Sequence, residues 1–110
     1  MCGLTGFLEP DSIFNTSQAK TTLLQMSHAL SHRGPDDQGT WIDPQAGIAL
    51  GHRRLSIIDL SSQGHQPMQS HCGRYVLVFN GEIYNYPVIR KELESLGKAP
   101  KWNGHSDTEI

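Results

Sequence analysis

The 110-residue sequence carries 9 basic and 11 acidic residues, for a formal net charge of -2, and 36% of its residues are hydrophobic. This length and composition predict one globular domain with a modest core. Lysine and arginine do not cluster, so we expect no nucleic-acid partner. The longest apolar run, "YVLVF", has the length of a strand, so we expect no membrane span. No signal peptide opens the chain, which favours a cytoplasmic location.

Cysteine and histidine usage argues against two further kinds of site. Cys2 and Cys72 are the only cysteines, which is too few for a disulfide framework and favours a reducing compartment. Among the six histidines, His28 and His32 are one helical turn apart, but no acidic residue lies between them as in zinc proteases. We therefore expect no metal site and no cofactor in this segment.

The first predicted elements are a strand and a helix. The apolar, glycine-containing stretch at residues 3–8 predicts a strand at a buried sheet edge, where backbones approach closely. Residues 16–32 predict an amphipathic helix that Thr16 or Ser17 caps. Its apolar positions, at helical spacing, are Ala19, Leu23, Met26 and Leu30. The turn sequence "RGPDDQG" ends this helix.

Extended segments make up the middle of the chain. Residues 40–43 and 47–52 predict a hairpin joined by "PQA". Residues 54–60 predict another short extended segment, and residues 61–73 predict a polar connection. The stretch at residues 74–79 is β-branched and aromatic without alternation, so we expect a strand that is covered on both faces.

The last predicted element is a second helix. "NGEIYNY" begins with a turn signal, after which Asn85 suits the helix cap and Gly97 suits the helix end. Its apolar stripe consists of Ile89, Leu93 and Leu96. The order of a strand, a helix, several antiparallel strands and a helix predicts an α+β fold with helices packed on an antiparallel sheet.

Cys2 is the first candidate for chemistry. If Met1 is removed, Cys2 carries both a thiol and a free α-amine. A thiol needs a base to become a good nucleophile, and an α-amine is a weaker base than a lysine side chain, so part of it is free base near neutral pH. One residue then supplies the nucleophile and its proton acceptor. The alternative is that a cysteine stands at this position by chance.

The stretch "FNGE" and three charged residues are further candidates. The amide of Asn80 and the backbone N–H of Gly81 suit a developing oxyanion, and glycine leaves that N–H accessible. Arg54 offers a planar fork for a substrate carboxylate, and Glu82 and Asp107 can accept hydrogen bonds from a substrate ammonium group. The alternatives are an ordinary tight turn in "FNGE" and solvated surface charges at the other positions.

Taken together, these stretches resemble the glutaminase domain of asparagine synthetases, one of the class II (N-terminal-nucleophile) glutamine amidotransferases. The matching stretches are "MCGLTGF", "SHRGPDDQG", "GHRRLSIIDLS", "GHQPM", "FNGEIYNY", "RKELESLG" and "HSDTEI". The opening "CG" and "HRGPD" are similar to class II amidotransferases in general. The stretches "RLSIIDLS", "GHQPM" and "NGEIYN" are similar to the asparagine synthetase branch in particular.

The resemblance implies a role for each matching residue. Cys2 would be the nucleophile that attacks the side-chain amide of L-glutamine, and Asn80 and Gly81 would form the oxyanion hole. Arg54 would bind the substrate carboxylate, and Glu82 and Asp107 would hold the α-amino group. The whole glutamine site would comprise Arg54, Leu55, Ser56, Ile57, Ile58, Asn80, Gly81, Glu82 and Asp107.

The resemblance also implies an architecture and a reaction for the whole enzyme. The fold would be an Ntn-hydrolase-like four-layer αββα sandwich of antiparallel sheets, and residues 1–110 would be its N-terminal half or so. The rest of the glutaminase domain and a synthetase domain that binds ATP and Mg²⁺ would be missing. In the full-length enzyme, ammonia from glutamine would feed ATP-dependent synthesis of asparagine from aspartate.

Two other functions stay open at this point. The acceptor of the ammonia could be a sugar or a peptide, or the chain could be a non-catalytic regulatory module. The sequence also leaves open whether Met1 is removed and whether the protein forms a homodimer. We expect the 110 residues alone to expose unpaired sheet edges and to rely on the missing half, so the isolated piece could be inactive.

Overall fold

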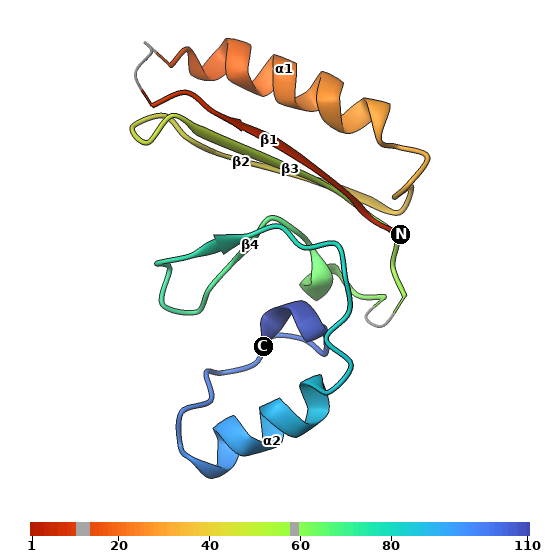
Figure 1. Cartoon of the computed structure of the whole chain (residues 1–110), viewed down its shortest axis with the longest axis vertical. Helices are drawn as coiled ribbons and strands as arrows, with labels where there is room; N and C mark the ends of the chain where they lie inside the picture. The colour runs from red at the N-terminus through yellow and green to blue at the C-terminus, as the bar shows by residue number, and fades with distance from the viewer. Residues whose placement is uncertain (11–13, 58–59) are drawn as a thin grey trace.

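The computed structural model describes residues 1–10, 14–57 and 60–110. The elements are β1 (Gly3–Leu8), α1 (Thr16–Ala29), β2 (Asp37–Asp43), β3 (Ile48–Arg54), β4 (Met68–Gln69), β5 (Val76–Leu77) and α2 (Tyr86–Ser95), with short 3₁₀ turns η1 (Ser62–Gly64) and η2 (Asp107–Glu109). Figure 1 shows α1, the sheet of β1 to β3, the hairpin that contains β4, and α2 in this order along the long axis. The predicted α+β class with antiparallel sheets is confirmed.

The first sheet has the strand order β1-β3-β2, and both pairs are antiparallel. The predicted edge position of residues 3–8 is confirmed, but the predicted burial is wrong, because Leu4 and Leu8 are exposed. The predicted hairpin at residues 40–43 and 47–52 is confirmed as β2 and β3, with both strands longer than predicted. In its register Gly3 lies opposite Arg53, and Asp37 lies opposite Arg54. The start of β1 therefore lies beside the end of β3, which brings the N-terminus of the chain to that end of the sheet.

Helix α1 is capped by the residue before the predicted ones. Asn15 has an extended backbone, and its side chain accepts a hydrogen bond from the Gln18 N–H at 3.0 Å. The prediction that Thr16 or Ser17 is the cap is therefore wrong, because both residues already belong to the helix. Asparagine is as strong a helix cap as serine, and here its side-chain oxygen satisfies an N–H of the first turn.

The core lies between α1 and the first sheet. Helix α1 covers one face of that sheet and contacts all three of its strands (Figure 1). Ala19 and Leu23 of α1 are buried together with Ala49 of β3, and Leu23 is 0% exposed. Met26 and Leu30, which were also predicted for this face, are half-buried. The predicted amphipathic helix is thus confirmed, with its most buried positions in the middle.

Residues 68–77 form a second, smaller sheet. Strands β4 and β5 pair antiparallel, and the hairpin is closed by the Ser70 N–H, which donates to the Tyr75 carbonyl at 2.9 Å. The Tyr75 N–H in turn donates to Ser70 Oγ at 3.0 Å. Residues 61–73 were predicted to be only a connection, which is wrong where β4 lies. Its closing contacts are polar and local, so no apolar pattern marks this hairpin in the sequence.

The strand predicted at residues 74–79 forms a ladder only at Val76–Leu77. Tyr75 is 63% exposed and Leu77 is 46% exposed. The prediction that both faces are covered is therefore wrong for the described residues, because Tyr75 and Leu77 lie on the same face of the strand and both are exposed. The extended segment predicted at residues 54–60 has no strand pairing after Arg54 in the described part, and residues 58–59 lie outside it.

Helix α2 has the predicted position but little burial. It follows Asn85, whose side chain makes no capping hydrogen bond, and it ends before Gly97, which has a φ of 66°. Ile89 and Leu93 of the predicted stripe are half-buried, and Leu96 is 59% exposed. Neither α1 nor α2, the helices of the described residues, is long and apolar enough to cross a membrane.

Replacing Leu23 tests whether the core lies under α1. Because Leu23 is fully buried, Leu23→Ala should lower the free energy of unfolding by about 2–5 kcal/mol. Leu24→Ala is the matched control, since Leu24 lies on the same helix and is 39% exposed, and it should cost about 1 kcal/mol or less. Urea denaturation followed by circular dichroism measures both variants, and equal losses would contradict this placement of the core.

Candidate active site

One cavity gathers most of the residues predicted for the site. It lies where the N-terminus, the end of β3, the segment after β5 and the turn η2 meet, and we call it the site cavity. The predicted site residues that line it are Cys2, Arg54, Leu55, Ile57, Gly81, Glu82 and Asp107. These residues come from the start, the middle and the end of the chain, so only the fold brings them together.

Three predicted site residues do not line the site cavity as described. Asn80 lies between two residues of the lining but is itself exposed. The backbone N–H of Ser56 donates to Asp36 Oδ2 at 2.7 Å, and Ser56 is not part of the lining. Ile58 lies outside the described residues.

The Cys2 thiol is held at the site cavity by Leu55. The Leu55 N–H donates to Cys2 Sγ at 3.3 Å, and the thiol donates to the Leu55 carbonyl at 3.6 Å. Arg33 Nε donates to the Cys2 carbonyl at 3.1 Å and so fixes the main chain at the same residue. Met1 is 75% exposed. The position of the sulfur therefore depends on segments that are far from residue 2 in the sequence.

Arg54, and not its neighbour Arg53, lines the site cavity. Successive residues of a strand point to opposite faces, and Arg53 Nη1 donates to Gln38 Oε1 at 2.7 Å on the other side. Arg54 is only 8% exposed, and its Nη1 donates to the Ser61 carbonyl at 2.7 Å. Gly64 packs against the guanidinium so closely that a Cβ atom at residue 64 would clash with it. The guanidinium is thus fixed in place before any ligand arrives.

Two carboxylates line the same cavity. Asp107, the first residue of η2, is 6% exposed, and its Oδ2 accepts a hydrogen bond from the Ile83 N–H at 2.8 Å. Glu82 precedes Ile83 and is exposed. A guanidinium and two carboxylates around one thiol complement a ligand that has both a carboxylate and an ammonium group. An α-amino acid has this pair of charges.

Sequence reasoning assigned no role to several other residues of the lining, chief among them Gln66. Gln66 is 6% exposed, its Oε1 accepts from the Phe79 N–H at 2.6 Å, and its Nε2 donates to Thr108 Oγ1 at 3.4 Å. Its stretch, "GHQPM", entered only as part of the resemblance. A glutamine in a polar stretch gives no sign of burial, so the only available signal was its place directly before a proline.

His52 lies directly behind the site cavity on β3. It is 1% exposed, and its Nε2 lies 3.1 Å from the Phe79 carbonyl oxygen. A carbonyl only accepts, so this contact requires the Nε2–H tautomer. Burial lowers the pKa of His52 below its ordinary value of 6.5, against the opposing effects of the Phe79 carbonyl and Asp37. The ring is therefore neutral at pH 7 and still donates to Phe79.

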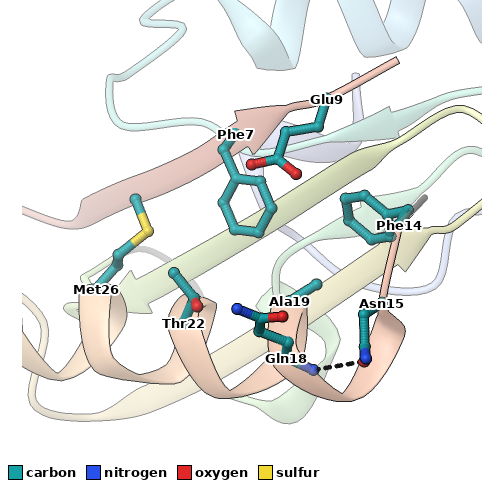
Figure 2. Close-up of a pocket in the computed structure, with 8 residues that line it drawn as sticks. All are labelled: Phe7, Glu9, Phe14, Asn15, Gln18, Ala19, Thr22 and Met26. Atoms are coloured by element: carbon teal, nitrogen blue, oxygen red, sulfur yellow. Dashed lines mark hydrogen bonds between the residues drawn. The ribbon is translucent and has the colours of Figure 1, made fainter. Parts of the chain in front are cut away.

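A larger cavity lies between β1 and α1 and has a volume of about 330 Å³. Figure 2 shows Phe7 and Phe14 in its wall, with the Glu9 carboxylate beside Phe7. None of the predicted site residues is among the described residues that line it. The site cavity measures about 70 Å³ and is open to solvent, so a bound molecule can extend beyond it. We place the site in the smaller cavity because its charges and thiol, and not its volume, suit a reaction.

Comparison with known proteins identifies the family of the chain. The whole chain, residues 1–110, matches the family described as a glutamine amidotransferase domain. The chain belongs to this family. The resemblance seen in the sequence motifs is therefore confirmed.

Several curated relatives of this amidotransferase domain are much longer proteins. The chain is 41% identical over 110 residues to glutamine-hydrolyzing asparagine synthetase 1 of Bacillus subtilis, which covers 100% of this chain and 17% of that protein. It is 42% identical over 105 residues to a putative glutamine-hydrolyzing asparagine synthetase of Mycobacterium tuberculosis, covering 86% of this chain and 16% of that protein. It is also 37% identical over 117 residues to Amidase chry2 of Gibberella zeae, covering 100% of this chain and 17% of that protein.

The burial of His52 predicts a pH dependence of stability. Its pKa is lower in the folded state than the ordinary value of 6.5, so the unfolded chain takes up a proton first as the pH falls. The free energy of unfolding should therefore decrease as the pH falls through 6.5 towards the folded-state pKa of His52. Thermal unfolding of the wild type and of His52→Gln at pH 7.5 and at about pH 5.5 measures this loss, which the variant should show less strongly.

The other histidines provide the control for this experiment. All five are exposed, so His28→Gln should leave the loss seen in the wild type unchanged. An equal loss in the wild type and in His52→Gln would contradict the assignment of the pH dependence to the buried ring.

Proposed function

We propose that this chain hydrolyses the side-chain amide of L-glutamine to glutamate and ammonia through a thioester at Cys2. The observation that carries the proposal is the site cavity, which combines the Cys2 thiol with Arg54 and Asp107. Membership of the glutamine amidotransferase family supports glutamine as the substrate.

Before the first reaction cycle, an aminopeptidase hydrolyses the peptide bond between Met1 and Cys2, for which Met1 is accessible because it is 75% exposed. The freed α-amine of Cys2 takes the thiol proton while the sulfur bonds to the amide carbon, and the amide oxygen becomes an oxyanion. As the oxyanion collapses, the C–N bond breaks and the amine returns its proton to the leaving ammonia. Water that the same amine deprotonates then attacks the thioester, and glutamate leaves with the thiol restored.

Charged residues of the site cavity orient the substrate in this proposal. Arg54 binds the α-carboxylate with its planar fork, whose position is already fixed by Ser61. Asp107 and Glu82 accept hydrogen bonds from the α-ammonium group. Leu55, which already contacts the thiol, borders the apolar stem of the substrate.

The oxyanion is stabilised by donors from the segment after β5. The backbone N–H of Gly81 belongs to a lining residue, which supports this role. The side chain of Asn80, which is exposed, would turn towards the cavity when substrate binds. Donors of this kind are worth about 2.7–4 kcal/mol each in the transition state, provided that they point at the developing charge.

We further propose that the chain is the N-terminal part of a longer cytoplasmic enzyme. It spans only 17% of the Bacillus subtilis relative. The completed glutaminase domain would be a four-layer αββα sandwich, and the layer of α1 on the first sheet in Figure 1 supports the first two of these layers. A separate synthetase domain would bind ATP and Mg²⁺ and use the ammonia to convert aspartate to asparagine. The names of the Bacillus and Mycobacterium relatives support this product.

A second candidate keeps the glutaminase reaction but changes the acceptor. Its support is the 37% identity to Amidase chry2, a relative that is not named as an asparagine synthetase. The acceptor would then be a small molecule such as a sugar or a peptide. Incubation of the full-length protein with glutamine, ATP, Mg²⁺ and aspartate separates the two candidates. Asparagine as the product supports the first, and ammonia release without asparagine supports the second.

Cys2→Ala tests the nucleophile. The variant lacks the sulfur that forms the thioester, so glutamine-dependent activity of the full-length protein should fall below detection. Ammonia-dependent synthesis should stay within about twofold of the wild type, because free ammonia bypasses the glutaminase step. Ammonia release from glutamine and product formation are measured in parallel, and an equal loss of both activities would count against the assignment.

Covalent labelling gives an independent measurement of the same thiol. Cys72 is a competing target, because a hydrogen bond from the Ser70 hydroxyl lowers the pKa of this exposed thiol. The Cys72→Ser protein is therefore treated with a glutamine-analogue electrophile and digested for mass spectrometry. The label should appear on a Cys2 that has lost Met1. A chain that keeps Met1, or a thiol that stays unlabelled, would favour a non-catalytic regulatory module.

Arg54→Lys tests substrate binding. Lysine keeps the positive charge but loses the planar fork, so KM for glutamine should rise about 10- to 100-fold while kcat changes less. Arg74→Lys makes the same replacement at an exposed position outside the site cavity and should leave KM within about twofold of the wild type. Steady-state kinetics of glutamine hydrolysis by the full-length protein measure both KM values. An unchanged KM for Arg54→Lys would show that Arg54 does not bind the substrate.

A further inference from the structure

We propose that Gln66 and His52 are positioning residues, which clamp the backbone of Phe79 and thereby aim the oxyanion donors of Asn80 and Gly81. This inference rests on the proposed glutaminase function. Neither side chain has to touch the substrate carbonyl for this role, since each acts through the main chain of the residue that precedes the donors.

Both polar groups of the Phe79 backbone are held by buried side chains. Its N–H donates to Gln66 Oε1 at 2.6 Å, and its carbonyl accepts from His52 Nε2 at 3.1 Å. Gln66 is 6% exposed and His52 is 1% exposed, so water competes poorly for either contact. Phe79 lies beyond the last residue of β5, and among the described residues no strand pairing holds it. The Gln66 and His52 side chains therefore supply the backbone hydrogen bonds that a neighbouring strand would otherwise make with Phe79.

The other end of the donor segment has a matching anchor. The Ile83 N–H donates to Asp107 Oδ2 at 2.8 Å. The next residue after Asp107 is Thr108, whose hydroxyl accepts from Gln66 Nε2 at 3.4 Å. Gln66 thus binds the Phe79 backbone directly, and through Thr108 of η2 it is linked to Asp107, which binds the Ile83 N–H. Its amide has one acceptor and one donor in use, which fixes the orientation of the whole group.

The residues between the two anchors are exposed, with the Phe79 ring lying close to Gly81. Asn80, Gly81 and Glu82 are all exposed, in contrast to the buried residues that flank them in space. A donor contributes to catalysis only when it points at the developing oxyanion, and a misplacement of about 1 Å can cost about 100-fold in rate. The orientation of the donors therefore depends on the two contacts at Phe79 and the one at Ile83.

Gln66→Met tests the clamp, because methionine keeps the length of the side chain and loses both hydrogen bonds. In the full-length protein kcat for glutamine hydrolysis should fall about 10- to 100-fold, while KM should stay within about threefold because Arg54 is untouched. Ammonia-dependent synthesis should be unchanged. Gln63→Met is the matched control, since Gln63 is exposed and lies outside the site cavity, and it should keep the wild-type kcat.

His52 provides a second test that does not depend on the folding of the Gln66 variant. His52→Gln keeps an N–H donor near the position of Nε2, whereas His52→Met has similar length and no donor. We expect kcat within about threefold of the wild type for His52→Gln and a loss of about tenfold or more for His52→Met. Thermal unfolding of both variants, measured beside the kinetics, separates a loss of stability from a change in the orientation of the oxyanion donors.

The outcomes distinguish the clamp from the function on which it rests. If the wild-type protein neither releases ammonia from glutamine nor takes the label at Cys2, the proposed function fails. If the wild type is active and every folded variant that lacks a clamp hydrogen bond keeps its kcat, the function stands and the clamp is wrong. A parallel rise of KM and fall of kcat, or equal losses for His52→Gln and His52→Met, would likewise overturn the positioning role.

Discussion

Polar contacts from the end of the first sheet hold the second half of the chain in place. Asp37 Oδ2 lies 2.6 Å from His65 Nδ1, His52 donates to Phe79, and Arg54 donates to Ser61. The second half offers little apolar burial of its own, since α2 has no buried residue. The fold is thus built from an apolar layer under α1 and a polar seam at the opposite face of the sheet. The site cavity lies in that seam.

Sequence periodicity correctly predicted the elements in which the spacing of apolar residues alone decides which side chains are buried. Leu23 and Ala19 stand at helical spacing and are buried as that spacing requires. Gly97 ends α2 because its positive φ suits glycine. The pattern failed where a contact depends on residues distant in sequence or on polar groups alone. The β4–β5 hairpin, closed by the hydroxyl of Ser70, is of this kind, and so is the exposure of Leu77.

Chemistry was readable from the sequence where a residue type is unusual for its place. A cysteine at position 2 and an arginine that opens the stretch "RLSIIDL" both attract attention, and Cys2 and Arg54 line one cavity. Gln66 and His52 were not readable in this way. Both are common polar residues, and their importance comes from burial against the Phe79 backbone, which no local pattern encodes. Asn80 is the opposite case. Its residue type and position predicted an oxyanion donor, but Asn80 is exposed and is not among the lining residues of the site cavity.

A site held by polar contacts responds differently to substitutions from a site held in an apolar core. Removing a methylene from a packed core mainly lowers stability, because dispersion contacts and buried area are lost wherever the cavity forms. Removing one hydrogen bond at the Phe79 backbone leaves the layer between α1 and the sheet intact, since Leu23 and Ala49 do not contribute to it. The oxyanion donors at Asn80 and Gly81 would then lose their orientation, while the free energy of unfolding would change little. The donor segment and the sheet that carries Arg54 can therefore be perturbed separately by single substitutions.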